Sequence, residues 1–259
     1  MQDTEELLKS LREAVDDAIR GERRVGVAFS GGLDSGIVAM LAAEALGREN
    51  VKCYALGVGL SPEESGRTHD IRSARAGAGE LGLELVEISM SPDEVRLSAD
   101  DLGSMFGIED RFIISIELPL LAVASRAHER VILLGQGADE LFGGYQRYLR
   151  MTPAGLRTAL EKDASGLGEV VDRESHIAGR FRKEFRYPYL HPGVSALAER
   201  LPVERKVCAG QRKIILREAA RMAGMPESLA GKEKKAAQYG SGTWRVLRPR
   251  SEARPAEEE

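Results

Sequence analysis

The sequence predicts an α/β protein, with a doubly wound parallel sheet followed by a mainly helical lobe. Three observations predict this class. Short apolar runs alternate with helix-length segments over about the first 140 residues, which is typical of parallel βαβ units. A turn rich in serine and glycine joins the first apolar run to a helix, where doubly wound sheets bind ligands. Beyond about residue 140, the pattern is mostly helical and rich in arginine.

The expected elements follow in chain order. An N-terminal helix begins at a capping box, Asp-Thr-Glu-Glu at residues 3–6, and ends at Gly21. Apolar runs bounded by turn residues predict four strands, at residues 24–29, 52–58, 84–88 and 131–134. Helices are expected between the strands at 36–46, 62–81 and 113–130, and in the lobe at 141–160, 167–183, 194–201 and 211–222.

The predicted elements divide the chain into three parts. Residues 1–22 form the N-terminal helix. Residues 23–243 form one domain, with an α/β part over 23–140 and the helical lobe over 141–243. Residues 244–259 are polar, charged and contain proline, so we expect a disordered tail.

Composition excludes several classes of function. Hydrophobic residues make up 42% and charged residues 30%, which is typical of a soluble domain with a buried core. The two cysteines and four histidines show no spacing typical of a disulfide framework or a zinc site. No apolar run approaches the roughly 20 residues that a membrane-spanning helix needs. The acidic N-terminus does not resemble a signal peptide, so we expect a cytoplasmic protein that contacts no membrane.

Charge is distributed unevenly along the chain. Residues 151–235 contain 17 lysines and arginines against 11 acidic residues, a net charge of +6. The remainder therefore carries −10, which gives the whole chain its formal −4. A basic lobe beside an acidic half favours an anionic partner, either a nucleoside triphosphate or RNA. An ordinary solvated helical surface would produce the same pattern.

The strongest functional signal is the first turn, residues 30–35, which follows an apolar strand. Its two glycines let the backbone approach a ligand closely. The helix that follows directs its N–H groups and partial positive charge at whatever is bound there. Two serines add hydroxyl donors, and an aspartate adds a carboxylate for a divalent cation. We therefore predict that nucleotide phosphates bind the following residues: Ser30, Gly31, Gly32, Asp34 and Ser35. The turn is not a Walker A loop, because no G-x-x-x-x-G-K-[ST] occurs in the chain.

A second turn of similar design, residues 135–139, follows the fourth expected strand. Gly135, Gln136 and Gly137 end the strand, and Asp139 opens a helix. Because the carboxyl ends of parallel strands meet at one edge of a sheet, Asp34 and Asp139 are expected to flank one Mg²⁺ beside the phosphates. Acidic residues are also favoured in the first turn of any helix, which is the ordinary alternative.

Together the two turns resemble the synthetase domain of asparagine synthetases, within the PP-loop ATP pyrophosphatase superfamily. The matching residues are S-G-G-L-D-S followed by G-x-G-A-D-E-L-F-G-G-Y. Further along, residues 184–190 resemble the family's E-x-R-x-P-F-L-D, residues 213–217 its K-x-x-L-R, and residues 232–234 its R-x-K. The resemblance covers about residues 20–243 and implies an adenine nucleotide alpha hydrolase-like fold.

The resemblance implies a two-step reaction that uses ATP and Mg²⁺. A carboxylate, by default aspartate, attacks the α-phosphorus of ATP to give an acyl-adenylate and pyrophosphate. Ammonia or another amine then displaces AMP and forms an amide. In this scheme the first turn holds pyrophosphate, Asp34 and Asp139 hold Mg²⁺, and Lys213 and Lys234 supply mobile positive charge where negative charge develops. The nucleotide is also expected to contact the following strand-end residues, which could equally be ordinary buried positions: Ala28, Leu56 and Gly135.

Three departures from the family pattern matter. Position 2 is glutamine instead of the cysteine of a glutaminase domain, so we expect free ammonia, another amine or a separate glutaminase subunit as the nitrogen source. Gln136 replaces a family glutamate and cannot accept a proton, although it keeps the shape of the side chain. The run 112–119 lacks the family's basic residue for the substrate carboxylate, and its Glu117 suits a cationic or hydroxylated substrate instead.

Two other functions stay open at this point. The basic lobe favours an RNA-modifying PP-loop enzyme, although the two cysteines form no C-x-x-C pair for sulfur transfer. Gln136 favours a regulatory subunit that binds nucleotide without turnover. The amide synthetase accounts for more of the motifs than either alternative.

Overall fold

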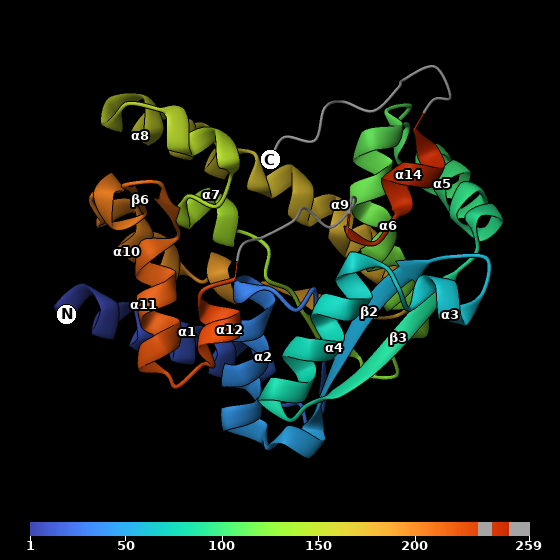
Figure 1. The fold of residues 1–259 in the computed structure, drawn as a ribbon, viewed down its shortest axis with the longest axis horizontal. Coiled ribbons are helices and arrows are strands. Elements are labelled where there is room, and N and C mark those ends of the chain that lie inside the picture. The colour runs from blue at the N-terminus through green and yellow to red at the C-terminus, as the bar shows by residue number, and fades with distance from the viewer. Residues whose placement is uncertain (233–239, 249–259) are drawn as a thin grey trace.

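A computed structural model describes residues 1–232 and 240–248 of the chain (Figure 1). Its centre is a five-stranded sheet in the order β3-β2-β1-β4-β5, and every neighbouring pair is parallel. The doubly wound parallel sheet is therefore confirmed. The strands are β1 (Val25–Ala28), β2 (Val51–Val58), β3 (Glu84–Met90), β4 (Val131–Leu133) and β5 (Glu184–Arg186).

Alternate residues of the central strands face two separate cores, as the period of two along a strand requires. Val131 and Leu133 of β4 belong to one core, while Ile132 between them belongs to the other. In β2, Cys53 belongs to the first core and the next residue, Tyr54, to the second. The sheet is buried on both faces, which is why its central strands are continuous apolar runs.

The two faces carry different sets of helices. In Figure 1 the first set extends from the left to the lower centre, and the second set lies toward the upper right. On the first face lie α1 (Gln2–Ile19), α2 (Leu33–Leu46), α4 (His69–Leu81), α10 (Pro192–Arg200), α11 (Ile214–Met222) and α12 (Glu227–Ala230). On the second face lie α5 (Pro92–Phe106), α6 (Arg111–Arg126), α9 (Leu167–Arg180) and α14 (Thr243–Leu247). In the described residues, no helix combines the length and apolar character needed to cross a membrane.

Several helix expectations need correction. The helix expected over 62–81 is two helices, α3 (Pro62–Ser65) and α4, because Gly66 caps the first and Thr68 begins the second. The helix expected over 141–160 is also divided. Gly143, at φ +76°, ends α7 (Ala138–Phe142), and Thr152 caps α8 (Pro153–Ser165).

Several elements were not expected, among them helix α5 and strand β5. Helix α5 begins at a capping box in which the side chains of Ser91 and Glu94 each accept from the other's backbone N–H. Strand β5 was not predicted because it has only three residues, of which only Phe185 is buried, so it shows no apolar run.

The expected tail begins too early at residue 244. Residues 243–247 form α14, in which Leu247 is buried and Trp244 meets Phe112 edge to face with ring centroids 5.2 Å apart. The expectation of disorder for residues 249–259 lies outside the described residues.

Candidate active site

The two turns identified in the sequence open at the same edge of the sheet. The first follows β1 and the second follows β4, and these strands are adjacent and parallel. Strands β2 and β3 extend the sheet on one side of this pair and β5 on the other, so the turns lie at the topological switch point. A Cβ at Gly135 would lie 3.1 Å from the backbone nitrogen of Ser35, so the second turn packs directly on α2.

The first turn is compact and supported from outside. The backbone nitrogen of Ser30 donates to the hydroxyl of Ser35 at 3.2 Å. Gly31 adopts φ +68°, and a Cβ there would overlap the backbone carbonyl of Ser73 in α4. Gly32, which has no side chain to occupy the site, is the N-cap of α2. The first turn therefore presents a helix N-terminus of the kind that binds phosphate.

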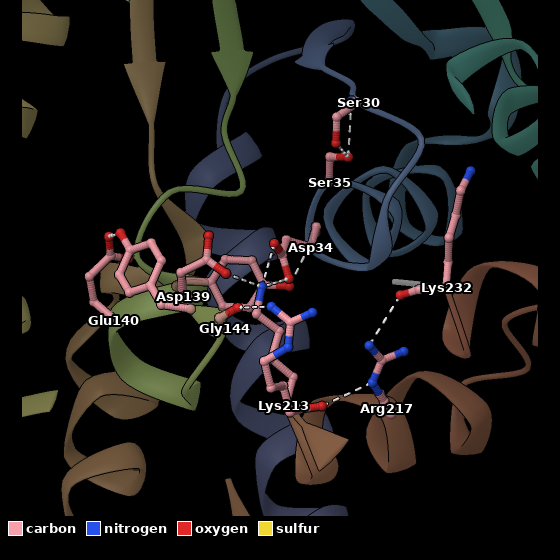
Figure 2. A network of polar contacts seen from close by, with 12 residues as sticks. Ser30, Asp34, Ser35, Asp139, Glu140, Gly144, Lys213, Arg217 and Lys232 are labelled. Carbon is pink, nitrogen blue, oxygen red and sulfur yellow. Dashed lines mark hydrogen bonds and ion pairs between the residues drawn. The ribbon is translucent and has the colours of Figure 1, made fainter. Parts of the chain in front are cut away.

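Lys213 joins the two turns through their acidic residues. Its Nζ lies 2.7 Å from each carboxylate oxygen of Asp34 and 2.5 Å from Oδ1 of Asp139, as Figure 2 shows. Lys213 is 4% exposed and Asp34 6%. The site therefore holds two carboxylates, buried Asp34 and half-buried Asp139, around one buried ammonium group.

The backbone packs closely against Asp34, Lys213 and Asp139, which together form an ion triad. Lys213 itself has φ +55°, a strained value for a residue with a side chain. A Cβ at Gly144 would overlap both Asp139 and Lys213, so only glycine fits there. Tyr189 donates its hydroxyl to the backbone carbonyl of Asp34 at 3.1 Å, and burial raises the pKa of this tyrosine.

Arg217 connects α11 to the segment that reaches the first turn. Its guanidinium donates to the carbonyl oxygens of Arg212 at 3.0 Å, Ala230 at 2.6 Å and Lys232 at 3.1 Å. Figure 2 shows Arg217 beside Lys232. The Nζ of Lys232 in turn donates to the carbonyl of Gly31 at 3.0 Å, and burial lowers the pKa of this lysine. Arg217 therefore positions a lysine that holds the first turn in shape.

A second buried polar cluster lies between α6, α9 and the end of β5. It contains Glu117, Arg173, Glu174 and Tyr187, and the Nε of Arg173 donates to Oε1 of Glu117 at 3.0 Å. Both glutamates are 3% exposed. Burial raises the pKa of Glu117, while burial and then the charge of Glu117 raise the pKa of Glu174 to about 8.

The sequence matches the Asparagine synthase family over residues 6–162 and 164–256, nearly the whole chain. The chain belongs to the asparagine synthase family.

The curated relatives of this asparagine synthase domain are longer proteins. It is 30% identical over 283 residues to the putative glutamine-hydrolysing asparagine synthetase 1 of Methanocaldococcus jannaschii, covering 94% of this chain and 50% of that protein. It is 31% identical over 173 residues to the glutamine-hydrolysing asparagine synthetase 1 of Bacillus subtilis, covering 64% of this chain and 26% of that protein. The chain thus spans half or less of the length of these relatives. Among solved structures, NMN synthetase from Francisella tularensis aligns with a TM-score of 0.45 and 14% identity, over 92% of this chain and 76% of that one.

Most residues assigned from the sequence surround the switch point of this asparagine synthase domain. Gln136 is half-buried in the second turn, and Ala28 and Leu56 lie on the face covered by α5 and α6. Lys234 lies outside the described residues. The residues that meet around the triad and the first turn are Ser30, Gly31, Gly32, Asp34, Ser35, Gly135, Asp139 and Lys213.

Sequence reasoning missed several residues that contribute to the site. Lys232 had a signal, because it begins the R-x-K match, but only Lys234 was assigned a role. Ser73 and Tyr189 had none, since each reaches the site from a helix or loop far away in the chain.

Replacing Arg217 with lysine is expected to lower the free energy of unfolding by about 2 kcal/mol, because one ammonium group cannot donate to three separate carbonyls as the guanidinium does. Arg221→Lys is the matched control. Arg221 lies one turn away on α11 in an exposed ion pair with Glu227, so we expect a change within about 0.5 kcal/mol. Urea unfolding of both variants measures this. Equal losses of unfolding free energy in the two variants would show that the three contacts of Arg217 do not stabilise the fold.

The raised pKa of Glu174 predicts how stability depends on pH. Between its ordinary pKa of 4.5 and about 8, the folded chain keeps a proton that the unfolded chain releases. Stability therefore falls as pH rises through this window, with a slope near 1.4 kcal/mol per pH unit from this group. Glu174→Gln should remove that slope, whereas Glu169→Gln, at an exposed position of the same helix, should keep it. Urea unfolding at several pH values tests this, and an unchanged slope in Glu174→Gln would contradict it.

Proposed function

We propose that this chain is an AMP-forming amide synthetase. It activates a carboxylate, with aspartate as the default, by attack on the α-phosphorus of ATP, which releases pyrophosphate. Ammonia then attacks the acyl-adenylate and displaces AMP. The observation that carries the proposal is the convergence of Asp34, Lys213 and Asp139 beside the first turn, because this site combines phosphate-binding backbone with buried charge of both signs.

The residues present fit the Mg²⁺ that such a reaction uses. One ammonium group touches both carboxylates at 2.5 to 2.7 Å, so the two carboxylates lie close enough together for one small cation to reach both. Among the described residues, no set of three or more His, Cys, Asp and Glu side chains could hold a metal ion. Two carboxylates suffice for Mg²⁺ when substrate phosphates and water complete its shell. The bound ion would neutralise negative charge on the phosphates.

The chain's own residues have distinct tasks in this proposal. The N–H groups at the start of α2 bind and orient the phosphates. Lys213, held between two carboxylates, supplies positive charge as the bond between the α- and β-phosphates breaks. Lys232 and Ser73 hold the carbonyl of Gly31 in place at 3.0 and 3.3 Å. We assign Lys234 a second stabilising charge by its place in the family motif, and Gln136 a hydrogen bond without proton transfer.

An ATP–pyrophosphate exchange screen across carboxylates tests the proposal, because exchange requires only the first half-reaction. We expect exchange with at least one carboxylate, and AMP together with asparagine when aspartate and ammonium are supplied. Exchange with another carboxylate but not with aspartate would keep the chemistry and reject the substrate. Absence of exchange with every carboxylate, despite ATP binding, would reject the synthetase.

A further inference from the structure

The helical lobe contains a buried lysine that the reaction described above does not use. Lys206 is 5% exposed and lies between the short helix η4 (Val203–Arg205) and the strand β6 (Val207–Cys208). One residue from each of these elements packs with Leu156 and Leu160 of α8 in a small third core. Lys206 therefore lies where α8 meets β6, at the upper left of Figure 1.

The charge of Lys206 has no partner in the part of the chain that the structure describes. Its Nζ forms neither a hydrogen bond nor an ion pair with any residue of 1–232 or 240–248. Burial and then the positive charge of Arg157 lower the pKa of Lys206 to about 8, against an opposite effect of Glu199. Lysines in folded proteins are almost never buried unless they are paired. The environment of Lys206 therefore lacks a negative charge.

Arg157 provides a second positive charge at the surface of the same place. It is exposed, it follows Leu156 on α8, and within the described residues it also forms no ion pair. A guanidinium group can donate two parallel hydrogen bonds to an oxyanion, and an ammonium group adds a compact charge. A phosphate group carries more negative charge than a carboxylate and offers three strong acceptor oxygens. Phosphate therefore matches this pair of cations best.

We propose that Lys206 and Arg157 bind the phosphate group of a small anion at a site separate from the first turn. The separation follows from α7, which begins at the second turn and ends at Gly143. A Cβ at Gly143 would lie 3.6 Å from the Cβ of Lys206, so the anion site is at the end of α7 that is remote from Asp139. The inference concerns binding alone and does not depend on the proposed synthetase.

The site is connected to the ion triad through the backbone. The carbonyl oxygen of Lys206 accepts a hydrogen bond from the backbone nitrogen of Ile214 at 3.0 Å, and Ile214 directly follows Lys213. The strands β6 and β7 (Gln211–Arg212) form a hairpin between the two lysines. An anion that fixes Lys206 therefore also supports the backbone that positions Lys213.

Calorimetric titration of inorganic phosphate, pyrophosphate and AMP tests the site, with and without saturating ATP to occupy the first turn. We expect wild-type protein to bind at least one of these anions in the presence of ATP. Lys206→Met and Arg157→Gln should each weaken this binding about tenfold or more, and Arg157→Lys should recover part of the loss. Lys162→Met is the matched control, because Lys162 is an exposed lysine of the same helix, and it should bind as wild type.

Urea unfolding gives a second readout. In the absence of phosphate, Lys206→Met should be at least as stable as wild type, because it removes a buried charge that has no partner. Millimolar phosphate should raise the urea midpoint of the wild type and of Lys162→Met but not that of Lys206→Met. Arg157→Gln changes an exposed position and keeps the test valid if Lys206→Met does not fold.

Three results would overturn the site. The first is equal binding of phosphate by the wild type, Lys206→Met and Arg157→Gln. The second is binding that saturating ATP abolishes, which would assign the anion to the first turn. The third is binding of an RNA oligonucleotide but of no small phosphate, which would assign the basic lobe to nucleic acid. None of these measurements needs turnover, so a failure of ATP–pyrophosphate exchange would reject the synthetase and leave this site standing.

Discussion

Replacing Lys213 with methionine is expected to lower the rate of ATP–pyrophosphate exchange about a thousandfold. Methionine keeps an unbranched side chain of similar length but removes the charge. The Nζ of Lys213 is the positive group that meets Asp34 and Asp139 at 2.5 to 2.7 Å. Without it, two buried carboxylates would face the phosphates and repel them.

The same substitution is expected to lower the free energy of unfolding by about 3 to 5 kcal/mol, because removing one partner of a buried ion pair leaves the other uncompensated. Lys52→Met is the control. Lys52 forms an ion pair with Glu84 at 3.0 Å at the sheet surface, and its loss should change stability by about 1 kcal/mol or less.

Magnesium makes this prediction sharper. If the two carboxylates form a cation site once Lys213 is removed, Mg²⁺ should raise the urea midpoint of Lys213→Met more than that of the wild type. Two results would show that this lysine is not the charge at the centre of the site. One is wild-type stability of Lys213→Met without Mg²⁺, and the other is a rate of ATP–pyrophosphate exchange within about tenfold of the wild-type rate.

The fold and the meeting of the two turns could be predicted because their signals are local. Each turn is a short run of serine, glycine and aspartate after an apolar strand, and the rule for parallel sheets places both at one edge. The ion triad could not be derived in this way. Lys213 and Asp34 are 179 residues apart, and Lys232 and Gly31 are 201 apart, so no local pattern connects them. Only the family resemblance indicated Lys213 and the motif that contains Lys232.

The remaining errors have a physical cause in short or interrupted elements. Strand β5 pairs through only three residues, and single glycines, Gly66 and Gly143, end helices that were expected to continue beyond them. The glutamate cluster shows the same limit in the site. Glu117 was singled out because the run 112–119 lacks the basic residue of the family pattern. Its neighbour Glu174 comes from another helix, 57 residues away, and only the packing of α6 on α9 brings the two together.

Replacing Gly31 with alanine is expected to lower the free energy of unfolding by about 3 kcal/mol and to weaken ATP binding about tenfold or more. Two effects combine at this position. An alanine at φ +68° pays about 1 kcal/mol for the left-handed backbone. Its Cβ would also overlap the carbonyl of Ser73, a backbone atom in α4 that cannot rotate away, so the first turn must move.

Gly21→Ala separates the two effects. Gly21 has φ +82°, but a Cβ there meets nothing within 4 Å, so only the backbone strain of about 1 kcal/mol applies. The difference between the two variants therefore measures the crowding at Ser73, and calorimetric titration of ATP measures what that crowding does to the phosphate site. Because Ser73 and Lys232 both donate to the carbonyl of Gly31, displacing this residue also breaks the contacts that hold the turn. If Gly31→Ala were no more damaging than Gly21→Ala and bound ATP normally, the close approach of the first turn to α4 would have no part in holding the nucleotide.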